Sequence, residues 1–290
     1  HTMIIAIDGG GTRCRVAASD GDQAVTIETG SANVSTDFES AVDQIEQGLA
    51  RLAARLGQPV ESLSAMPAYV GVAGVTGPAV AERLRSVLPF RHVRISDDRP
   101  AAVRGVLGPR DGFIGHCGTG SFFAGQQDGE IVLSGGWGPV LGDEASAQWV
   151  GRKALCLTLE TVDGRLERSP LSDLLLSEFE DAAGIVRFAS TAQPVEFGAL
   201  APHVTAFAVR QDAIAGRIMR QGADEIARAL RHLGWRPGDT VSLTGGIGPF
   251  YAPYLPDDLR ASVADRTAEP LDGAISLARE FAREIANECN

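Results

Sequence analysis

The feature that most constrains this 290-residue chain is its start, where an apolar segment runs directly into Asp8-Gly9-Gly10-Gly11-Thr12. Consecutive glycines leave backbone N–H groups bare and allow them to approach a ligand closely. Successive N–H groups in such a turn form a nest that holds an anion, typically a phosphate. A carboxylate beside that nest would repel a phosphate unless a divalent cation with oxygen ligands lies between them. The opening therefore predicts a phosphate site with Mg²⁺ at Asp8, and an ordinary glycine turn after a strand is the plainer alternative.

The composition narrows the class of partner. Lys plus Arg is 26 and Asp plus Glu is 37, so the net charge is −11. This charge argues against nucleic acid or an anionic membrane surface as the main partner, although a local nest and a metal ion can still bind a nucleotide. No two of the four cysteines form a CxxC pair, which argues against a zinc ribbon, and so few cysteines in a chain of this length are typical of a reducing cytoplasm. We expect a cytoplasmic protein that acts on a small molecule, and the sequence leaves a homodimer open.

Hydrophobic periodicity predicts two α/β halves. A three-stranded meander is expected over residues 4–29, followed by a helix over 38–56 whose apolar residues recur at spacings of three and four. Near residue 111 the pattern restarts with a strand, then Gly118-Thr119-Gly120-Ser121, then a hairpin. This order predicts mixed sheets covered by helices, with ligand between the two halves.

The remainder of the second half is expected to be mostly helical. Helices are predicted over 144–157, 171–182, 204–233 and 271–288. The long segment 204–233 is interpreted as one helix because its apolar residues share one face. A buried strand over 240–244 ends in Gly245-Gly246.

Three glycine clusters therefore follow apolar strands, at 8–12, 118–121 and 245–248. Each would place backbone donors at the carboxyl end of a strand, where open α/β sheets bind ligands. The plainer reading of each cluster is a tight loop, because glycine turns are common. The segment 115–121 has the glycine spacing of a P-loop, but Ser121 stands where that motif needs a lysine.

The candidate general base lies after the strand over 92–95. Two adjacent carboxylates, Asp97 and Asp98, follow that strand where a helix is expected to begin. An Asp at a strand's carboxyl end can accept a proton from a substrate hydroxyl, and an Asp before a helix is also a favoured N-cap. We interpret Asp98 as the cap and Asp97 as the base.

A further glycine-rich segment runs over 135–144 and places Trp137, Asp143 and Glu144 close together. An aromatic face with acidic groups that accept hydroxyl hydrogen bonds is typical of a sugar site. The alternative is that Trp137 belongs to the core and that Glu144 stabilises a helix N-terminus through the dipole.

Taken in order, these segments resemble the sugar kinases of the hexokinase and actin superfamily. The likeness is closer to the N-acetylglucosamine and glucosamine kinase group, which shares a family with the activator ATPases of benzoyl-CoA reductase. It runs from Ile4 to about Ala282, and the most diagnostic part is Gly136-Trp-Gly138 with Gly142-Asp-Glu144. The resemblance implies an α/β fold of two ribonuclease H-like (actin-like ATPase) domains with an interdomain cleft. These would span 3–110, joined by the C-terminal helix at about 272–288, and 111–271.

The resemblance also implies a function and a role for each matching position. The reaction would be ATP-dependent phosphorylation of an amino sugar, N-acetylglucosamine or glucosamine, at its 6-hydroxyl, with ATP and Mg²⁺ as cofactors. Asp8 would hold Mg²⁺ and Asp97 would be the base. The nucleotide would contact Gly9, Gly10, Gly11, Thr12, Gly118, Thr119, Gly120, Ser121, Gly245 and Gly246. The sugar would contact Asn33, Thr119, Gly136, Trp137 and Asp143.

The sequence departs from the family pattern at two places. Arg13-Cys14 replaces the usual Lys-Thr, and Asp98-Arg99-Pro100 replaces small residues.

Two alternative functions stay open. One is a nucleotide-hydrolysing activator of a 2-hydroxyacyl-CoA dehydratase or benzoyl-CoA reductase type system, in which Cys117 and Cys156 would hold an iron–sulfur cluster. The other is a non-catalytic sugar sensor.

Overall fold

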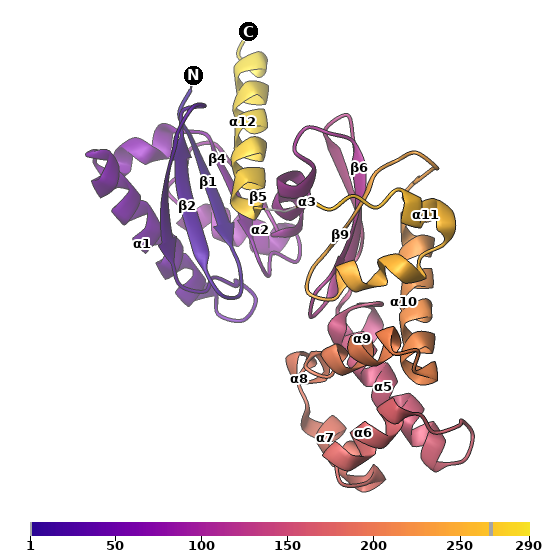
Figure 1. Ribbon diagram of the computed structural model, residues 1–290. Helices are drawn as coiled ribbons and strands as arrows, with labels where there is room; N and C mark the ends of the chain where they lie inside the picture. The colour runs from indigo at the N-terminus through magenta and orange to yellow at the C-terminus, as the bar shows by residue number, and fades with distance from the viewer. Residues whose placement is uncertain (1, 267–268) are drawn as a thin grey trace. The chain divides into compact units, whose positions relative to one another are not determined.

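The computed structural model describes residues 2–266 and 269–290, which form two compact units (Figure 1). The first unit contains the described residues up to Pro109 together with those from Glu269 onward. The second unit is the continuous segment Arg110–Arg266. The two ends of the chain thus belong to the same unit.

Unit 1 is built on a five-stranded mixed sheet of order β3-β2-β1-β4-β5. The predicted meander is confirmed, because the first three strands are antiparallel neighbours. The two later strands run parallel to β1, so their carboxyl ends reach the same edge of the sheet as that of β1. The strands are β1 (Ile4–Gly9), β2 (Cys14–Ser19), β3 (Ala24–Thr29), β4 (Ala68–Val72) and β5 (Val93–Ser96).

Helices cover both faces of this sheet, as the alternation of side chains along β1 requires. Ile5 and Ile7 belong to the core cluster formed with α1 (Phe38–Leu56), whereas Ile4 and Ala6 pack with α12 (Pro270–Glu288). Figure 1 shows these two helices on opposite sides of the strands. Unit 1 also contains η1 (Val60–Ala65), α2 (Pro78–Val87) and α3 (Arg99–Leu107).

Local signals set the ends of α1 as predicted. The Asp37 carboxylate accepts a hydrogen bond of 3.0 Å from the amide of Ser40 and caps the helix start. Gly57 ends the helix at φ 67°, a left-handed conformation that glycine adopts without steric cost.

Two glycines allow α3 and α12 to cross almost backbone to backbone. A Cβ on Gly105 would lie 2.5 Å from the carbonyl oxygen of Glu269, and one on Gly273 would overlap the carbonyl of Ala101. The helix that follows Asp97 and Asp98 is therefore held in place by the last helix of the chain.

Unit 2 repeats the opening pattern, as the sequence predicts. Its four-stranded sheet has the order β8-β7-β6-β9, with β6, β7 and β8 antiparallel and β9 parallel to β6. The strands are β6 (Gly112–Cys117), β7 (Ser121–Gln127), β8 (Glu130–Gly135) and β9 (Val241–Thr244). The helical elements are α4 (Gly138–Leu141), α5 (Ala147–Val162), α6 (Pro170–Glu178), α7 (Ala182–Thr191), α8 (Pro194–Gly198), α9 (Ala201–Val209), α10 (Ala213–His232), η2 (Gly248–Tyr254) and α11 (Asp257–Ala261).

The prediction of a single helix over 204–233 is wrong. The segment is divided between α9 and α10. Gln211 adopts φ 66°, which ends α9, and the Asp212 carboxylate accepts from the amide of Ala215 at 2.9 Å and starts α10. Asp212 also accepts from Ser169 and Leu171, so a buried cap network fixes the break. No helix in the described part of the chain is long and apolar enough to cross a membrane.

Candidate active site

The sheet of unit 1 brings the predicted carboxylates to one edge. The parallel register aligns Asp8 on β1 with Gly71 on β4, and Gly71 with Ser96 on β5. Asp97 and Asp98 directly follow Ser96, so they come to the same edge as Asp8. The carboxyl ends of parallel strands are where such sheets bind ligands.

The loop after β1 is tight and leaves backbone donors free. The amide of Gly10 donates to the carbonyl of Arg13 at 2.9 Å, which closes the turn. In the described chain the amides of Gly11 and Thr12 make no hydrogen bond, as an anion nest requires. The glycines lie outside the left-handed region, and Gly9 is needed for space, because a Cβ there would lie 3.3 Å from Ala32 and Val72.

Asp8 is held by a buried arginine on the neighbouring strand. One Asp8 oxygen accepts from the guanidinium of Arg15 at 3.0 Å, and the other end of that guanidinium donates to Glu269 at 3.0 Å. Glu269 immediately precedes α12, so this pair of ion pairs ties the Asp8 carboxylate to the start of the last helix. The Asp8 side chain is 13% exposed, so solvent can still reach the carboxylate.

The two adjacent carboxylates have different surroundings. Asp98 occupies the N-cap position of α3, as predicted, but its side chain does not cap the helix. Asp98 already has helical backbone angles (φ −78°, ψ −10°) and makes no capping hydrogen bond. It is Asp97 that accepts from the amide of Arg99 at 2.9 Å. Asp97 is also bound by both ends of the Arg99 guanidinium, at 2.7 and 3.1 Å.

The Asp98 carboxylate is half-buried and makes no hydrogen bond to another residue among those that the structure describes. Its pKa is raised by burial, by the charge of Asp97 and by the charge of Asp8. A carboxylate with a raised pKa and no internal partner accepts a proton more readily than one paired with arginine.

Asn33, predicted to bind sugar hydroxyls, uses its oxygen within its own loop. This atom accepts from the amide and hydroxyl of Ser35, at 3.0 and 2.8 Å, and from the amide of Thr36 at 3.3 Å. The side-chain NH₂ group makes no hydrogen bond within the part of the chain that the structure describes, so Asn33 can offer hydrogens to a ligand.

In unit 2 the loop 118–121 is braced by hydrogen bonds to the segment that follows Gly142. The buried Asp143 carboxylate accepts from the amide of Ser121 at 3.2 Å and from the side chain of Gln148 at 2.7 Å. The Ser121 hydroxyl donates to the carbonyl of Glu144 at 2.6 Å. Asp143, predicted as a sugar ligand, thus has both oxygens bonded inside the protein, and it adopts a strained φ of 57°.

The same loop leaves two amides free. The amide of Gly118 donates to the carbonyl of Gly120 at 2.9 Å. Those of Thr119 and Gly120 make no hydrogen bond within the described residues, so they can meet an anion.

The third glycine cluster packs directly against this loop. Gly245 has φ 81°, and a Cβ there would overlap the carbonyl group of Cys117, so only glycine fits. The amide of Ile247 donates to the carbonyl of Cys117 at 3.0 Å. The backbone of the two loops is therefore joined at the ends of β6 and β9.

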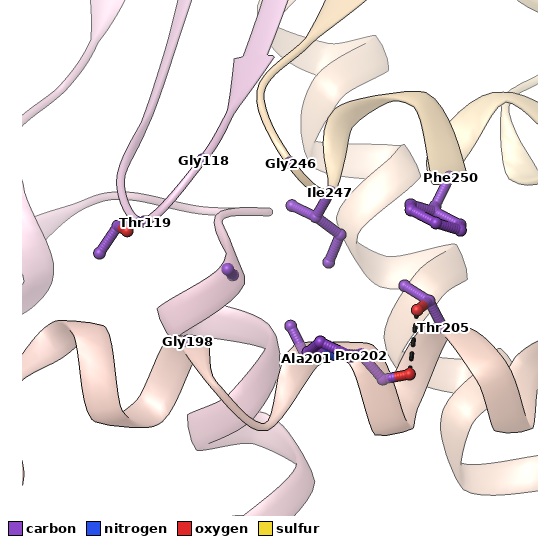
Figure 2. A pocket seen from close by; sticks show the side chains of 10 residues that line it. Gly118, Thr119, Gly198, Ala201, Pro202, Thr205, Gly246, Ile247 and Phe250 are labelled. Carbon is purple, nitrogen blue, oxygen red and sulfur yellow. Dashed lines mark hydrogen bonds between the residues drawn. The ribbon is translucent and has the colours of Figure 1, made fainter.

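A cavity of about 490 Å³ lies where these loops meet helices α8 and α9, as Figure 2 shows. Gly118, Thr119, Gly246 and Ile247 from the two predicted loops line it. Its other walls carry no site signal in the sequence, because they look like ordinary helix or core residues: Ala147, Gly198, Ala201, Pro202, Thr205 and Phe250. The volume suits a small-molecule ligand.

Gly136 and Trp137 lie in a different place from this cavity. Trp137 is 77% exposed, so the alternative that it belongs to the core is wrong. It lines a second cavity of about 320 Å³ with Glu144, Glu225 and Arg228 among its walls. Gly136 is exposed beside it at φ 76°.

The cysteines do not support a shared iron–sulfur cluster. Cys117 is completely buried, and this burial raises the pKa of its thiol, whereas Cys156 is exposed on α5. A buried protonated thiol is an inert core residue rather than a ligand at a subunit surface.

The residues present fit the implied cofactors. Within unit 2, the free amides of Thr119 and Gly120 and the apolar cavity suit the phosphates and base of a nucleotide. Among the described residues no group of three or more His, Cys, Asp or Glu side chains is placed to hold a metal. Nucleotide-bound Mg²⁺ typically takes only one or two carboxylates plus phosphates and water, so Asp8 alone suits it.

Comparison with known proteins identifies the family. Residues 5–255 match the model of the BadF/BadG/BcrA/BcrD ATPase family. A glucosamine kinase of Vibrio cholerae is 24% identical over 278 residues, which are 94% of this chain and 95% of that protein. An N-acetylmuramic acid/N-acetylglucosamine kinase of Clostridium acetobutylicum is 29% identical over 241 residues, 79% and 78% of the two chains.

A solved structure from Chromobacterium violaceum, titled as a candidate N-acetylglucosamine kinase, is 30% identical, with a TM-score of 0.77 over 96% of this chain and 99% of that one. The chain belongs to the BadF/BadG/BcrA/BcrD ATPase family. The family and fold class predicted from the sequence are confirmed, and the relatives confirm the predicted class of enzyme, a kinase.

Proposed function

We propose that this protein transfers the terminal phosphoryl group of ATP to the 6-hydroxyl of an amino sugar. The observation that carries the proposal is the cavity of about 490 Å³ that joins the glycine loops at 118–119 and 246–247. The names of the relatives, which are kinases of glucosamine, N-acetylglucosamine and N-acetylmuramic acid, support the choice of sugar class.

The nucleotide would bind with its base in the apolar part of this cavity. Ala201, Pro202 and Phe250 offer a surface for a flat base, and the free amides of Thr119 and Gly120 offer donors to the phosphates. In unit 1 the free amides of Gly11 and Thr12 offer a second set of donors. Phosphoryl transfer relies mainly on such positioning and charge stabilisation.

Asp8 is the residue that would hold Mg²⁺. When bound, the ion would supply neutralisation of the charge on the phosphate oxygens. Arg15 donates a hydrogen bond of 3.0 Å to one oxygen of the Asp8 carboxylate and fixes its position, which leaves the second oxygen for the ion or its water.

Of the two carboxylates after β5, we assign the general base to Asp98. The sequence alone favours Asp97, but both oxygens of Asp97 accept hydrogen bonds from Arg99. Asp98 has no such partner within the described chain, and its pKa is raised by burial and by neighbouring charges. Asp98 would accept the proton of the sugar hydroxyl, while the Asp97–Arg99 pair would fix the start of α3.

The sugar is proposed to contact Asn33, Thr119, Gly136 and Trp137. The free NH₂ group of Asn33 and the exposed indole of Trp137 support these assignments. For Asp143 the hydrogen bonds to Ser121 and Gln148 favour a different role, the support of the phosphate loop. A cytoplasmic location, supported by four free cysteines, stays a prediction.

A coupled ADP-release assay tests the function. The panel contains glucosamine, N-acetylglucosamine, N-acetylmuramic acid, glucose and a sample without sugar, each with MgATP. We expect ADP release with an amino sugar well above the sample without sugar, and ³¹P-coupled NMR of the product should place the phosphate on carbon 6. Equal ADP release with and without every sugar would contradict the proposal and favour the activator alternative.

A further inference from the structure

His116 is a histidine that the proposed function does not yet use, and it lies between the two loops of unit 2. It is the penultimate residue of β6, and the parallel register sets it opposite Thr244, the last residue of β9. The loop 118–121 begins two residues after His116, and the loop at Gly245 begins directly after Thr244. The two side chains are joined, with 2.9 Å between Nδ1 of His116 and Oγ1 of Thr244.

The surroundings of the ring keep it neutral and fixed. The imidazole stacks on Phe122 with ring centroids 5.0 Å apart and an angle of 28° between the planes. Burial lowers the pKa of His116, and a neutral imidazole carries one donor and one acceptor nitrogen.

The hydrogen bond to Thr244 indicates which nitrogen carries the proton. If the Thr244 hydroxyl donates to Nδ1, the proton lies on Nε2, and this N–H is the one group of the pair left without a partner among the described residues. The opposite arrangement would leave two such groups, the hydroxyl hydrogen and the Nε2 lone pair, so the first arrangement is favoured.

Nε2 faces the phosphate loop. It lies 3.4 Å from the position that a Cβ on Gly118 would occupy. Within the described residues Nε2 makes no hydrogen bond, and the free amides of Thr119 and Gly120 belong to the same loop. A donor nitrogen beside two free backbone donors suits an anionic oxygen.

We propose that the Nε2–H group of His116 donates a hydrogen bond to a phosphate oxygen of the bound nucleotide, and that Thr244 sets the tautomer that makes this possible. The inference rests on the proposed function, because it takes the loop 118–121 as the place of the phosphates. It assigns a binding role to a residue that lies before the glycine motif rather than inside it.

The test compares three variants by calorimetric titration with ADP and with ATP in the absence of sugar. His116→Phe keeps a ring that can stack on Phe122 but removes the donor, and we expect nucleotide affinity to fall by about 10-fold to 100-fold. His116→Gln places an amide donor near the position of Nε2 and should retain most of the affinity. Thr244→Val removes the hydroxyl and should weaken binding less than His116→Phe. The exposed His92→Phe is the matched control and should bind as the wild type does.

A second readout reports the tautomer of His116 directly. In ¹⁵N NMR of the free wild-type protein we expect His116 as the Nε2–H tautomer, and in Thr244→Val a mixture of tautomers. The Nε2 resonance should shift when ADP is added.

Two results would overturn the inference. One is a folded His116→Phe protein that binds nucleotide within about twofold of the wild type, a margin small beside the loss of a hydrogen bond to a charged group. The other is an Nδ1–H tautomer in the free protein. If instead the wild type fails to bind any nucleotide, the proposed function itself is refuted. Failure of the proposed function is thus distinguishable from failure of the His116 inference, in which the wild type still binds nucleotide.

Discussion

The two glycine loops that follow the first strand of each unit look alike in sequence but are built differently. In unit 1 the edge at β1 and β5 carries three carboxylates, Asp8, Asp97 and Asp98, with Arg15 and Arg99 paired to two of them. The loop 9–12 is closed by backbone hydrogen bonds alone. The edge of the sheet in unit 1 therefore presents charged side chains.

In unit 2 the corresponding edge presents neutral groups, and its one carboxylate in contact with the loop, Asp143, is buried. The loop 118–121 is braced by the buried Asp143 and by the carbonyl of Glu144, and the groups that it offers are amides and a neutral imidazole. The comparison teaches that one strand–turn–strand pattern can present charged side chains in unit 1 and uncharged hydrogen-bonding groups, backbone amides and an imidazole, in unit 2. Each experiment below tests this division, from the largest expected effect to the smallest.

The largest effect should come from the charged edge. Asp98→Asn should lower kcat by roughly 10²–10⁴-fold, because general base catalysis contributes about that much. Asp97→Asn should lower kcat by less than about tenfold, since its role is to hold Arg99 at the start of α3. Steady-state kinetics with the amino sugar that the panel identifies would measure both. A greater loss in Asp97→Asn than in Asp98→Asn would return the base to Asp97.

Removing the brace of the neutral edge should mainly affect stability. Asp143→Ala leaves the amide of Ser121 and the side chain of Gln148 without their acceptor, which should cost about 2–5 kcal/mol in the free energy of unfolding. The same change at Asn33 in unit 1 should cost less than about 1 kcal/mol, because the groups that it binds are exposed. Urea unfolding measures both values. Equal losses would show that the two loops are supported alike.

A matched pair of glycine changes sharpens the difference. A Cβ at Gly120 would lie 3.2 Å from both oxygens of Asp143, so Gly120→Ala should destabilise the protein by about 1–3 kcal/mol. Nothing lies within 4 Å of a Cβ at Gly11, so Gly11→Ala should change stability by less than about 0.5 kcal/mol. Gly11→Ala should nevertheless weaken nucleotide binding, which titration would detect. If Gly120→Ala were as stable as Gly11→Ala, the brace would be less rigid than the structure indicates.

The smallest effect is a shift in pH dependence. A protonated Asp98 cannot accept a proton, so kcat/KM should fall as the pH drops through its raised pKa. Because the charge of Asp97 contributes to that rise, Asp97→Asn should move the acid limb of the profile to lower pH.

The same raised pKa has a consequence for stability. The folded state binds the Asp98 proton more tightly than the unfolded state, so this contribution to stability is lost as the pH rises through the folded pKa. Asp98→Asn should therefore raise the Tm near neutral pH and give a smaller gain in acid. For the kinetic prediction, a pH profile of kcat/KM that does not shift in Asp97→Asn would contradict the assignment of Asp98 as the general base.

The sequence predicted the strands, the three glycine loops and the helix over 38–56 well, because these depend on local periodicity and on glycine. It placed the side-chain cap of α3 at Asp98 rather than Asp97, since the difference depends on Asp98 already having helical backbone angles. It joined α9 to α10 because a left-handed residue such as Gln211, which is not glycine, leaves no mark in a hydrophobic pattern.

The cavity wall and the brace were missed for a different reason. Ala201, Pro202 and Phe250 are apolar residues whose exposure to a cavity depends on tertiary packing. The glycine-rich sequence around Asp143 is typical of an exposed ligand-binding loop. Its side chain is instead buried and accepts a hydrogen bond from Ser121, 22 residues earlier in the chain. Contacts of that kind cannot be read from periodicity or spacing.

The close crossing of α3 and α12 at Gly105 and Gly273 bears on how the chain is made by a ribosome. Unit 2 is one continuous stretch and can complete its core while synthesis continues, whereas one helical layer of unit 1 lacks α12 until that helix has been made and has left the exit tunnel. Until then the face of β1 that carries Ile4 and Ala6 lacks the cover of α12, so the nascent chain should depend on chaperones most before that helix packs.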